Sequence, residues 1–326
     1  MTEHILDVDM LAFERGSGST RAAVVDGVRR SLASGFVTTS HDLPPDLLDT
    51  AYGLLAEFFA LPVSRKSAWA APGTHGQTGY TGLLVETAAT SETADWKEML
   101  NWGAPVASGH PLRTRYPHRY HPPVLPEADV PGIGAALTEL HDRTAALQRR
   151  FLRIIAVALG AGEGLFEACI ADGPHLSRAI HYPPMALAPG AEHVWAAEHT
   201  DINLITALPR ATAKGLQVRI EDAWVDVVPP EHHVVINTGI MLDRISNGLM
   251  PAGPHRVVAD AADPGVEGDR ISVVQFCHPT PWTTLAPLAG CVTRDNPQRH
   301  LPISAAALLD QVLWEINLVE EGRRLL

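Results

Sequence analysis

The sequence predicts a mainly β protein with flanking helices, in which a jelly-roll core follows a helical N-terminal region. Two observations support this fold class. After Ser177 the chain consists of short apolar runs broken repeatedly by Pro and Gly, the pattern of short strands in a sandwich or jelly roll. Before that point the apolar residues mostly recur with the 3.6-residue period of a helix. The 26 Gly and 26 Pro supply the turns that many short strands need.

The helices are predicted from apolar periodicity, capping residues and helix-ending glycines. A helix that starts at Ser19 or Thr20 is ended by Gly35, and Pro44-Pro45 starts the next one. Residues 71–131 are rich in Gly, Pro, Thr and His and have little periodicity apart from Trp96 to Trp102, which is typical of a binding loop or lid. The predicted helices cover residues 19–34, 44–61, 133–159 and 305–318.

The strands are predicted from apolar runs bounded by turn residues. We expect one structural unit, with a helical and irregular N-terminal module (1–130) packed on a jelly-roll catalytic core (131–326). Helix 133–159 would support that core, and helix 305–318 would cover one face. The predicted strands are residues 36–39, 178–182, 199–208, 216–220, 224–228, 233–237, 255–258 and 271–277.

Composition excludes several classes of protein. A formal net charge of −12 without a basic stripe argues against nucleic acid as a partner. Cys169, Cys277 and Cys291 are scattered and odd in number, which fits a reducing compartment. No basic segment of a signal peptide opens the chain, and the longest apolar run, 154–161, is too short for a membrane span. We therefore expect a cytoplasmic protein without a membrane partner; its oligomeric state is not predicted.

The triplet His199-Thr200-Asp201 is the strongest indication of chemistry. In an extended strand, residues two apart point to the same face, so His199 and Asp201 can bind one metal ion while Thr200 turns away. A distant His255 would complete the set. Two histidines and one carboxylate on one face of an ion form the facial triad of non-heme Fe(II) oxygenases, which leaves open positions for other ligands.

Sixteen histidines make a chance triplet plausible, so a polar surface pair is the alternative to a metal site. The apolar run that follows Asp201 argues against a surface pair, because a carboxylate that points inward must be paired or bind a metal. Turn residues that lead directly into His255 favour it as the third ligand. Other histidines compete for that role: His181, His193, His232 and His233.

Arg270 and Ser272 share one face of an apolar strand, where a guanidinium and a hydroxyl can together bind a carboxylate. Tyr182, which precedes two prolines, can donate a third hydrogen bond. The alternatives are a surface arginine and a tyrosine of the core.

These residues resemble the isopenicillin N synthase-like family of Fe(II)- and 2-oxoglutarate-dependent oxygenases. The likeness runs nearly end to end and includes Asp95-Trp96-Lys97-Glu98, Asn237-Thr238-Gly239 and Ser246-Asn247-Gly248. It implies a jelly-roll fold, O2 as a reactant and Fe(II) bound by His199, Asp201 and His255. It also implies that Arg270, Ser272 and Tyr182 bind 2-oxoglutarate as cosubstrate.

The sequence departs from the family pattern in two places. Ile180 stands where plant-type members have an asparagine that assists cosubstrate binding, and Gly239-Ile240 replaces a usual Gly-Asp pair. Asp201 is retained, which disfavours halogenation, because related halogenases lack that carboxylate. Isopenicillin N synthase has the Arg-x-Ser element but uses no 2-oxoglutarate, so Arg270 and Ser272 could instead hold a substrate carboxylate.

The resemblance implies a dioxygenase that oxidises an unactivated C–H bond of a small secondary metabolite, most often by hydroxylation, with succinate and CO2 as coproducts. Three alternatives remain: a 2-oxoglutarate-independent oxidase or cyclase, a desaturating or epimerising member of the family, and a catalytically silent binding module. Four further residues are expected near the barrel mouth, as substrate contacts, supporting residues or packing: Asn203, Phe276, Tyr80 and Lys97.

Overall fold

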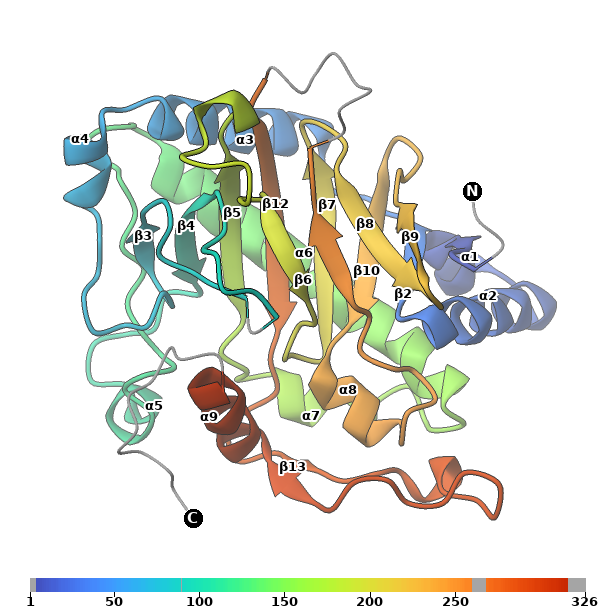
Figure 1. Cartoon of the computed structure of the whole chain (residues 1–326). Coiled ribbons are helices and arrows are strands. Elements are labelled where there is room, and N and C mark those ends of the chain that lie inside the picture. The colour runs from blue at the N-terminus through green and yellow to red at the C-terminus, as the bar shows by residue number, and fades with distance from the viewer. Residues whose placement is uncertain (1–3, 89, 260–267, 316–326) are drawn as a thin grey trace.

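The computed structural model describes residues 4–88, 90–259 and 268–315, and two β-sheets face one another at its centre (Figure 1). The major sheet has the strand order β1-β2-β10-β7-β12-β5-β4-β3, and the minor sheet has the order β6-β11-β8-β9. Neighbouring strands in both sheets are antiparallel, except that β1 and β2 of the major sheet are parallel. The major sheet consists of β1 (Asp7–Val8), β2 (Phe36–Ser40), β3 (Gly79–Thr81), β4 (Glu98–Gly103), β5 (Leu176–Tyr182), β7 (Ile205–Ala211), β10 (His233–Thr238) and β12 (Arg270–Cys277). The minor sheet consists of β6 (Ala196–His199), β8 (Leu216–Ile220), β9 (Ala223–Asp226) and β11 (His255–Val257).

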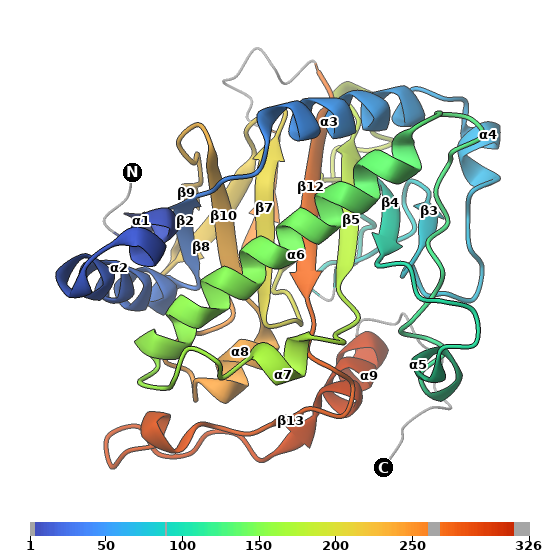
Figure 2. The same ribbon diagram turned by 180° about the vertical axis from the view of Figure 1, so that it is seen from behind.

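Helices cover the outer face of the major sheet, where α6 runs diagonally across the central strands beside α3 (Figure 2). Leu137, Leu147, Phe151 and Ile155 of α6 are buried, as the apolar periodicity predicts. After β12 come the short antiparallel pair β13 (Thr284–Leu285) and β14 (Ile303–Ser304) and then helix α9. The α-helices are α1 (Met10–Arg15), α2 (Gly18–Ser31), α3 (Pro45–Phe59), α4 (Val63–Ser67), α5 (Pro111–Arg115), α6 (Ile133–Ala158), α7 (Glu167–Ile170), α8 (Ile240–Ile245) and α9 (Ala305–Glu315).

Two buried polar side chains fix these helices to the sheet. The Tyr52 hydroxyl of α3 accepts a hydrogen bond from the backbone N–H of Val273 at 3.0 Å, next to the register shift between β12 and β7. Gln148 of α6 donates to the carbonyl oxygens of Gln275 at 2.8 Å and Ile205 at 3.2 Å. Hydrogen bonds of this kind satisfy backbone groups that would otherwise be buried without partners.

The mainly β fold with flanking helices is confirmed, but two sequence expectations need correction. Residues 199–208 do not form one strand: β6 ends at His199, and β7 begins only at Ile205. Residues 71–131 are not wholly irregular, because β3 and β4 extend the edge of the major sheet. The region 1–130 therefore contributes β1 to β4 to the main sheet.

Two expectations concern segments that the structure describes only in part. Helix α9 is described as far as Glu315, so the predicted residues 316–318 lie outside the described residues. Most of the acidic segment before Arg270, residues 260–267, also lies outside them. Among the described residues, no helix combines the length and the apolar character that a membrane span requires.

Buried neutral histidines should make the fold acid-sensitive. Burial lowers the pKa of His141 and of His175 from 6.5 to about 4. Between these two pH values the unfolded chain binds protons that the folded chain does not, so the free energy of unfolding should decrease as pH falls from about 6.5 to 4. Each histidine should contribute about 1.4 kcal/mol per pH unit. Urea unfolding at a series of pH values measures this slope.

His141→Gln provides the matched variant, because glutamine can keep a hydrogen bond to Ser177 Oγ, which lies 2.8 Å from His141 Nδ1, but does not titrate. In this variant the change of the free energy of unfolding with pH should be smaller by the contribution of one histidine. An unchanged slope would show that His141 is not the titrating group.

Candidate active site

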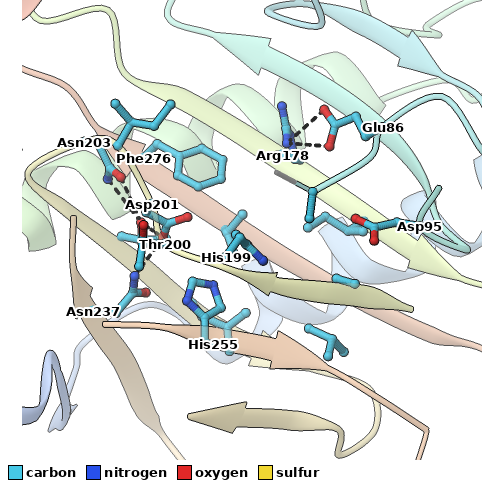
Figure 3. Close-up of a pocket in the computed structure, with 18 of the residues that line it drawn as sticks. Glu86, Asp95, Arg178, His199, Thr200, Asp201, Asn203, Asn237, His255 and Phe276 are labelled. Carbon is cyan, nitrogen blue, oxygen red and sulfur yellow. Dashed lines mark hydrogen bonds and ion pairs between the residues drawn. The ribbon is translucent and has the colours of Figure 1, made fainter. Parts of the chain in front are cut away.

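The two sheets enclose a cavity of about 420 Å³. Its walls come from the inner faces of β5, β7, β10 and β12 of the major sheet and of β6, β8 and β11 of the minor sheet. His199, Asp201 and His255 line one wall, and Phe276 and Arg178 lie across from His255 (Figure 3). The cavity is thus the place where the predicted metal ligands meet.

Strand pairing brings the two distant histidines together. His255 begins β11 and is the register partner of His199, the last residue of β6. Their ring centroids are 4.3 Å apart, and the candidate ligand atoms of His199, Asp201 and His255 all lie within 4.8 Å of one another. Phe36 of β2 packs edge-on against the His255 ring, with centroids 5.6 Å apart, and helps to hold it in place. The structure therefore assembles the predicted triad.

Asp201 reaches the histidines from a loop rather than from a strand. Residues 200–204 connect the minor sheet to the major sheet, and their carbonyl groups accept hydrogen bonds from the start of α8. Ile240 N–H donates to Asp201 at 2.8 Å, and Gly239 N–H donates to Leu204 at 3.0 Å. A Cβ on Gly239 would lie 2.2 Å from the Asn203 carbonyl oxygen, so this contact requires glycine.

The Asp201 carboxylate is buried and oriented by two side chains. Thr206 Oγ1 donates to Asp201 Oδ2 at 2.5 Å, and Asn237 Nδ2 donates to the same oxygen at 2.7 Å. Burial opposes ionisation, but the two histidines and these two donors hold the pKa of Asp201 below its ordinary value. The carboxylate is therefore charged at neutral pH, and its other oxygen is left for a metal ion.

Both histidines have their ring orientation set by a backbone carbonyl. His199 Nδ1 lies 2.8 Å from the Ala197 oxygen, and His255 Nδ1 lies 3.0 Å from the Gly253 oxygen. Because a carbonyl oxygen only accepts, each Nδ1 carries a proton, which leaves each Nε2 as the nitrogen that can bind a metal ion. Burial, followed by the neighbouring His255, lowers the pKa of His199 to about 4. Two imidazoles and one carboxylate form a ligand set that fits Fe(II).

Arg270 lies on the wall that β12 of the major sheet contributes to the cavity, and it is 2% exposed. Its Nη1 donates to Ser272 Oγ at 3.0 Å, its Nε donates to the Ala213 carbonyl at 3.1 Å, and its guanidinium lies 5.0 Å from the Tyr182 ring centroid. Burial lowers the pKa of Arg270. No carboxylate within the described ranges forms an ion pair with it, so a buried cation faces the cavity without a counter-charge. An anionic ligand would supply one.

The four residues expected near the barrel mouth have different positions. Phe276 and Lys97 line the cavity. Asn203 lines it too, but its amide group donates to Thr206 Oγ1 at 3.1 Å and so supports the residue that orients Asp201. Tyr80 is not among the lining residues: it packs against Phe58 of α3, because its side chain points to the helix-covered face of the sheet. Tyr80 therefore makes no contact with the cavity.

The competing histidines have other partners. His181 lies between Glu98, at 2.8 Å, and Asp269, at 3.0 Å. His193 lies 2.9 Å from the Ala94 oxygen, His232 is exposed, and His233 contacts the Glu231 oxygen. None of these four belongs to the triad.

Sequence reasoning assigned no role to several residues of the site. Thr206 and Asn237 orient Asp201, and Glu86 and Arg178 form an ion pair in the cavity (Figure 3). Asn237 occurs in a segment that resembles the family, which was the signal that the sequence offered for it. Glu86 lies in a loop without periodicity, so its position could not be predicted.

Two family profiles match this chain. A profile for the N-terminal region of non-haem dioxygenases in morphine synthesis matches residues 6–128, and a profile for the 2OG-Fe(II) oxygenase superfamily matches residues 174–279. The structure also resembles that of a putative 2OG-Fe(II) oxygenase family protein from Caulobacter crescentus. The two are 31% identical with a TM-score of 0.84, and the match covers 97% of this chain and 100% of that one. The chain belongs to the 2OG-Fe(II) oxygenase family.

Characterised relatives of this oxygenase act on small molecules. Mugineic-acid 3-dioxygenase from Hordeum vulgare is 26% identical over 298 residues, which cover 90% of this chain and 80% of the relative. Isopenicillin N synthase from Lysobacter lactamgenus is 29% identical over 174 residues, which cover 50% of each chain. The protein is thus an oxidoreductase of the dioxygenase class that uses Fe(II), 2-oxoglutarate and O2.

The hydrogen bonds to Asp201 should support metal affinity. Thr206→Val removes one of the two donors to Oδ2 with little change of volume, and loss of such a supporting contact weakens metal binding about 10- to 100-fold. Anaerobic Fe(II) titration measures the dissociation constant. Thr138→Val is the control, because the Thr138 hydroxyl donates to the Gly134 carbonyl within α6. A dissociation constant for Thr206→Val equal to that of the control would contradict this role.

Proposed function

We propose that this oxygenase oxidises an unactivated C–H bond of a small secondary metabolite, by hydroxylation, with 2-oxoglutarate converted to succinate and CO2. One observation carries the proposal: the triad of His199, Asp201 and His255 shares one cavity with Arg270, a buried arginine without an acidic partner in the described part of the chain. A metal ligand set and an anion-binding group in one enclosed space are what an oxidative decarboxylation of 2-oxoglutarate requires.

The chain's own residues would divide the work as follows. His199, Asp201 and His255 hold Fe(II), which when bound supplies the activation of O2 for attack on a C–H bond. Arg270 binds the distal carboxylate of 2-oxoglutarate, and the Ser272 hydroxyl adds a hydrogen bond. This pairing offsets the cost of burying the Arg270 charge.

Tyr182 contributes to the same cosubstrate subsite by position. It is the register partner of Arg270 on β5 and is 2% exposed. Trp195 packs against it with ring centroids 5.6 Å apart and fixes its ring. The Tyr182 ring lies beside the guanidinium and keeps water away from it, so the ion pair with a carboxylate would form in a low-dielectric environment, where it is stronger.

The rest of the wall determines which bond reacts. Val274 and Phe276 follow Ser272 on the cavity face of β12, and Ile180 faces the cavity from β5. These apolar groups exclude water and leave room for an organic substrate beside the metal. Orientation of one substrate C–H bond toward the iron is therefore the protein's main contribution.

Stoichiometry provides the first test. With Fe(II), 2-oxoglutarate and a substrate, one succinate should form for each O2 consumed, and the product should contain one added oxygen atom by mass spectrometry. His199→Ala should abolish both. O2 consumption without succinate would instead indicate a 2-oxoglutarate-independent oxidase, and a product that has only lost hydrogen would indicate desaturation.

Arg270 should determine affinity for the cosubstrate. Arg270→Met keeps an unbranched side chain but removes the charge, and the lost charge-assisted hydrogen bonds should weaken 2-oxoglutarate binding about 10- to 100-fold. The readout is the visible charge-transfer band during anaerobic titration of the Fe(II) protein. Fe(II) affinity itself should stay unchanged, and an unchanged 2-oxoglutarate affinity would refute the assignment.

A further inference from the structure

The cavity contains a second arginine on the same pair of strands as Arg270. Strand β5 presents Tyr182, Ile180 and Arg178 to the cavity, while the residues between them point to the other face of the sheet. Register pairs Arg270 with Tyr182 and Val274 with Arg178. Four residues of extended strand, roughly 13 Å, separate the two positions. One cation therefore lies at the cosubstrate end of the strand pair and another lies farther along the same wall.

The Arg178 guanidinium is fixed on one side and weakly bonded on the other. Its Nε donates to Asn101 Oδ1 of β4 at 2.7 Å, and its central carbon lies 5.5 Å from the Phe276 ring centroid. Its Nη1 lies 3.4 Å and 3.5 Å from the two oxygens of Glu86, whereas a charge-assisted hydrogen bond is usually about 2.7 to 2.9 Å long. No described residue accepts a hydrogen bond from its Nη2.

Glu86 cannot fully neutralise the charge of Arg178, because it also forms an ion pair with Lys97. Lys97 Nζ lies 3.3 Å from Glu86 and 2.7 Å from Asp95, so two carboxylates already surround it. Although burial opposes ionisation, Arg178 and Lys97 lower the pKa of Glu86 to about 2. Glu86 is thus a permanent anion shared by two cations. Arg178, which lines the cavity and pairs with Glu86 (Figure 3), has the longer contacts and retains hydrogen-bond donors that no described residue uses.

We propose that Arg178 binds a carboxylate of the substrate, and that this carboxylate displaces Glu86 from Arg178 toward Lys97. The inference rests on the proposed function, since it names the substrate class of the same site. Two guanidinium nitrogens of Arg178 donate hydrogen bonds to the incoming carboxylate, while the hydrogen bond from its Nε to Asn101 keeps the guanidinium in place. Phe276 contacts the apolar part of the substrate next to its carboxylate.

This arrangement would select substrates by length and charge. The carboxylate binds to Arg178, so the bond that reacts is the one whose distance from the carboxylate matches the separation of Arg178 and the iron. Glu86 disfavours a neutral ligand, because a neutral group cannot compensate for breaking the ion pair between Glu86 and Arg178. Substrates without a negative charge should therefore bind weakly.

The test compares carboxylates with neutral molecules of the same shape. The probes are benzoate, phenylacetate and indole-3-acetate, each paired with its carboxamide, added anaerobically to the Fe(II) protein saturated with 2-oxoglutarate. Binding is measured as a shift of the charge-transfer band and by calorimetry. At least one carboxylate should bind about 10- to 100-fold more tightly than its carboxamide, as expected for a hydrogen bond between charged groups.

Variants assign this preference to Arg178. Arg178→Met should abolish the preference for the carboxylate, and Arg178→Lys should retain part of it. Glu86→Gln should tighten carboxylate binding, because the competing negative charge is gone. Arg153→Met is the matched control: Arg153 lies on α6 and pairs with Glu167, and this variant should behave as the wild type. If Arg178→Met does not fold by circular dichroism, Arg178→Gln replaces it.

The outcomes separate the two proposals. Absence of the charge-transfer band with Fe(II) and 2-oxoglutarate alone would count against the proposed function. A normal band with carboxamides binding as tightly as carboxylates would overturn only the role of Arg178. A carboxylate preference that survives in Arg178→Met would also overturn it.

Discussion

The site depends on one buried negative charge. Asp201 is 7% exposed and remains ionised, because Thr206 and Asn237 donate to one of its oxygens and two imidazoles lie beside it. A carboxylate in this position is costly unless a cation completes its environment. The loop that carries Asp201 also crosses from the minor sheet to the major sheet, so the same few residues join the sheets and place the carboxylate of the candidate metal site. The geometry of the candidate metal site and the closure of the jelly roll are therefore linked.

Along β12, the alternate residues that face the cavity change from polar to apolar. The polar pair Arg270 and Ser272 is followed by the apolar pair Val274 and Phe276 on the same face. The neighbouring strand β5 adds Arg178 opposite Val274. The two-residue period of the strands thus places a polar end with Arg270, an apolar middle and a second cationic position along one wall. Reaction specificity in such a site is a question of distances along a strand.

Rigidity of this wall comes from the opposite face of the sheet. Tyr52 and Gln148 of α3 and α6 form hydrogen bonds with the backbone of β12, close to its register shift, and Gln275 bonds back to the His141 carbonyl of α6 at 2.9 Å. These contacts replace sheet hydrogen bonds that the irregular register would leave unmade. Helix packing and site geometry are consequently parts of one structure, although no helix from that layer contributes a metal ligand.

The sequence by itself determined the local chemistry: the residue types of the triad, the Arg-x-Ser pair, the helix periods and most strand positions. These follow from neighbours a few residues apart. It predicted wrongly that Asp201 lies in a strand, because the loop conformation depends on hydrogen bonds from Gly239 and Ile240, which lie far away in the chain. It also placed Tyr80 near the barrel mouth, because the facing direction of a three-residue edge strand depends on its packing against α3.

Only the tertiary structure decided which distant side chains meet. Pairing of β6 with β11 set His199 opposite His255, and folding of the loop before β4 brought Glu86 to Arg178. Such contacts depend on strand register and loop path, which no local pattern encodes. The sequence thus specified the groups that can perform the chemistry, and long-range packing specified their distances.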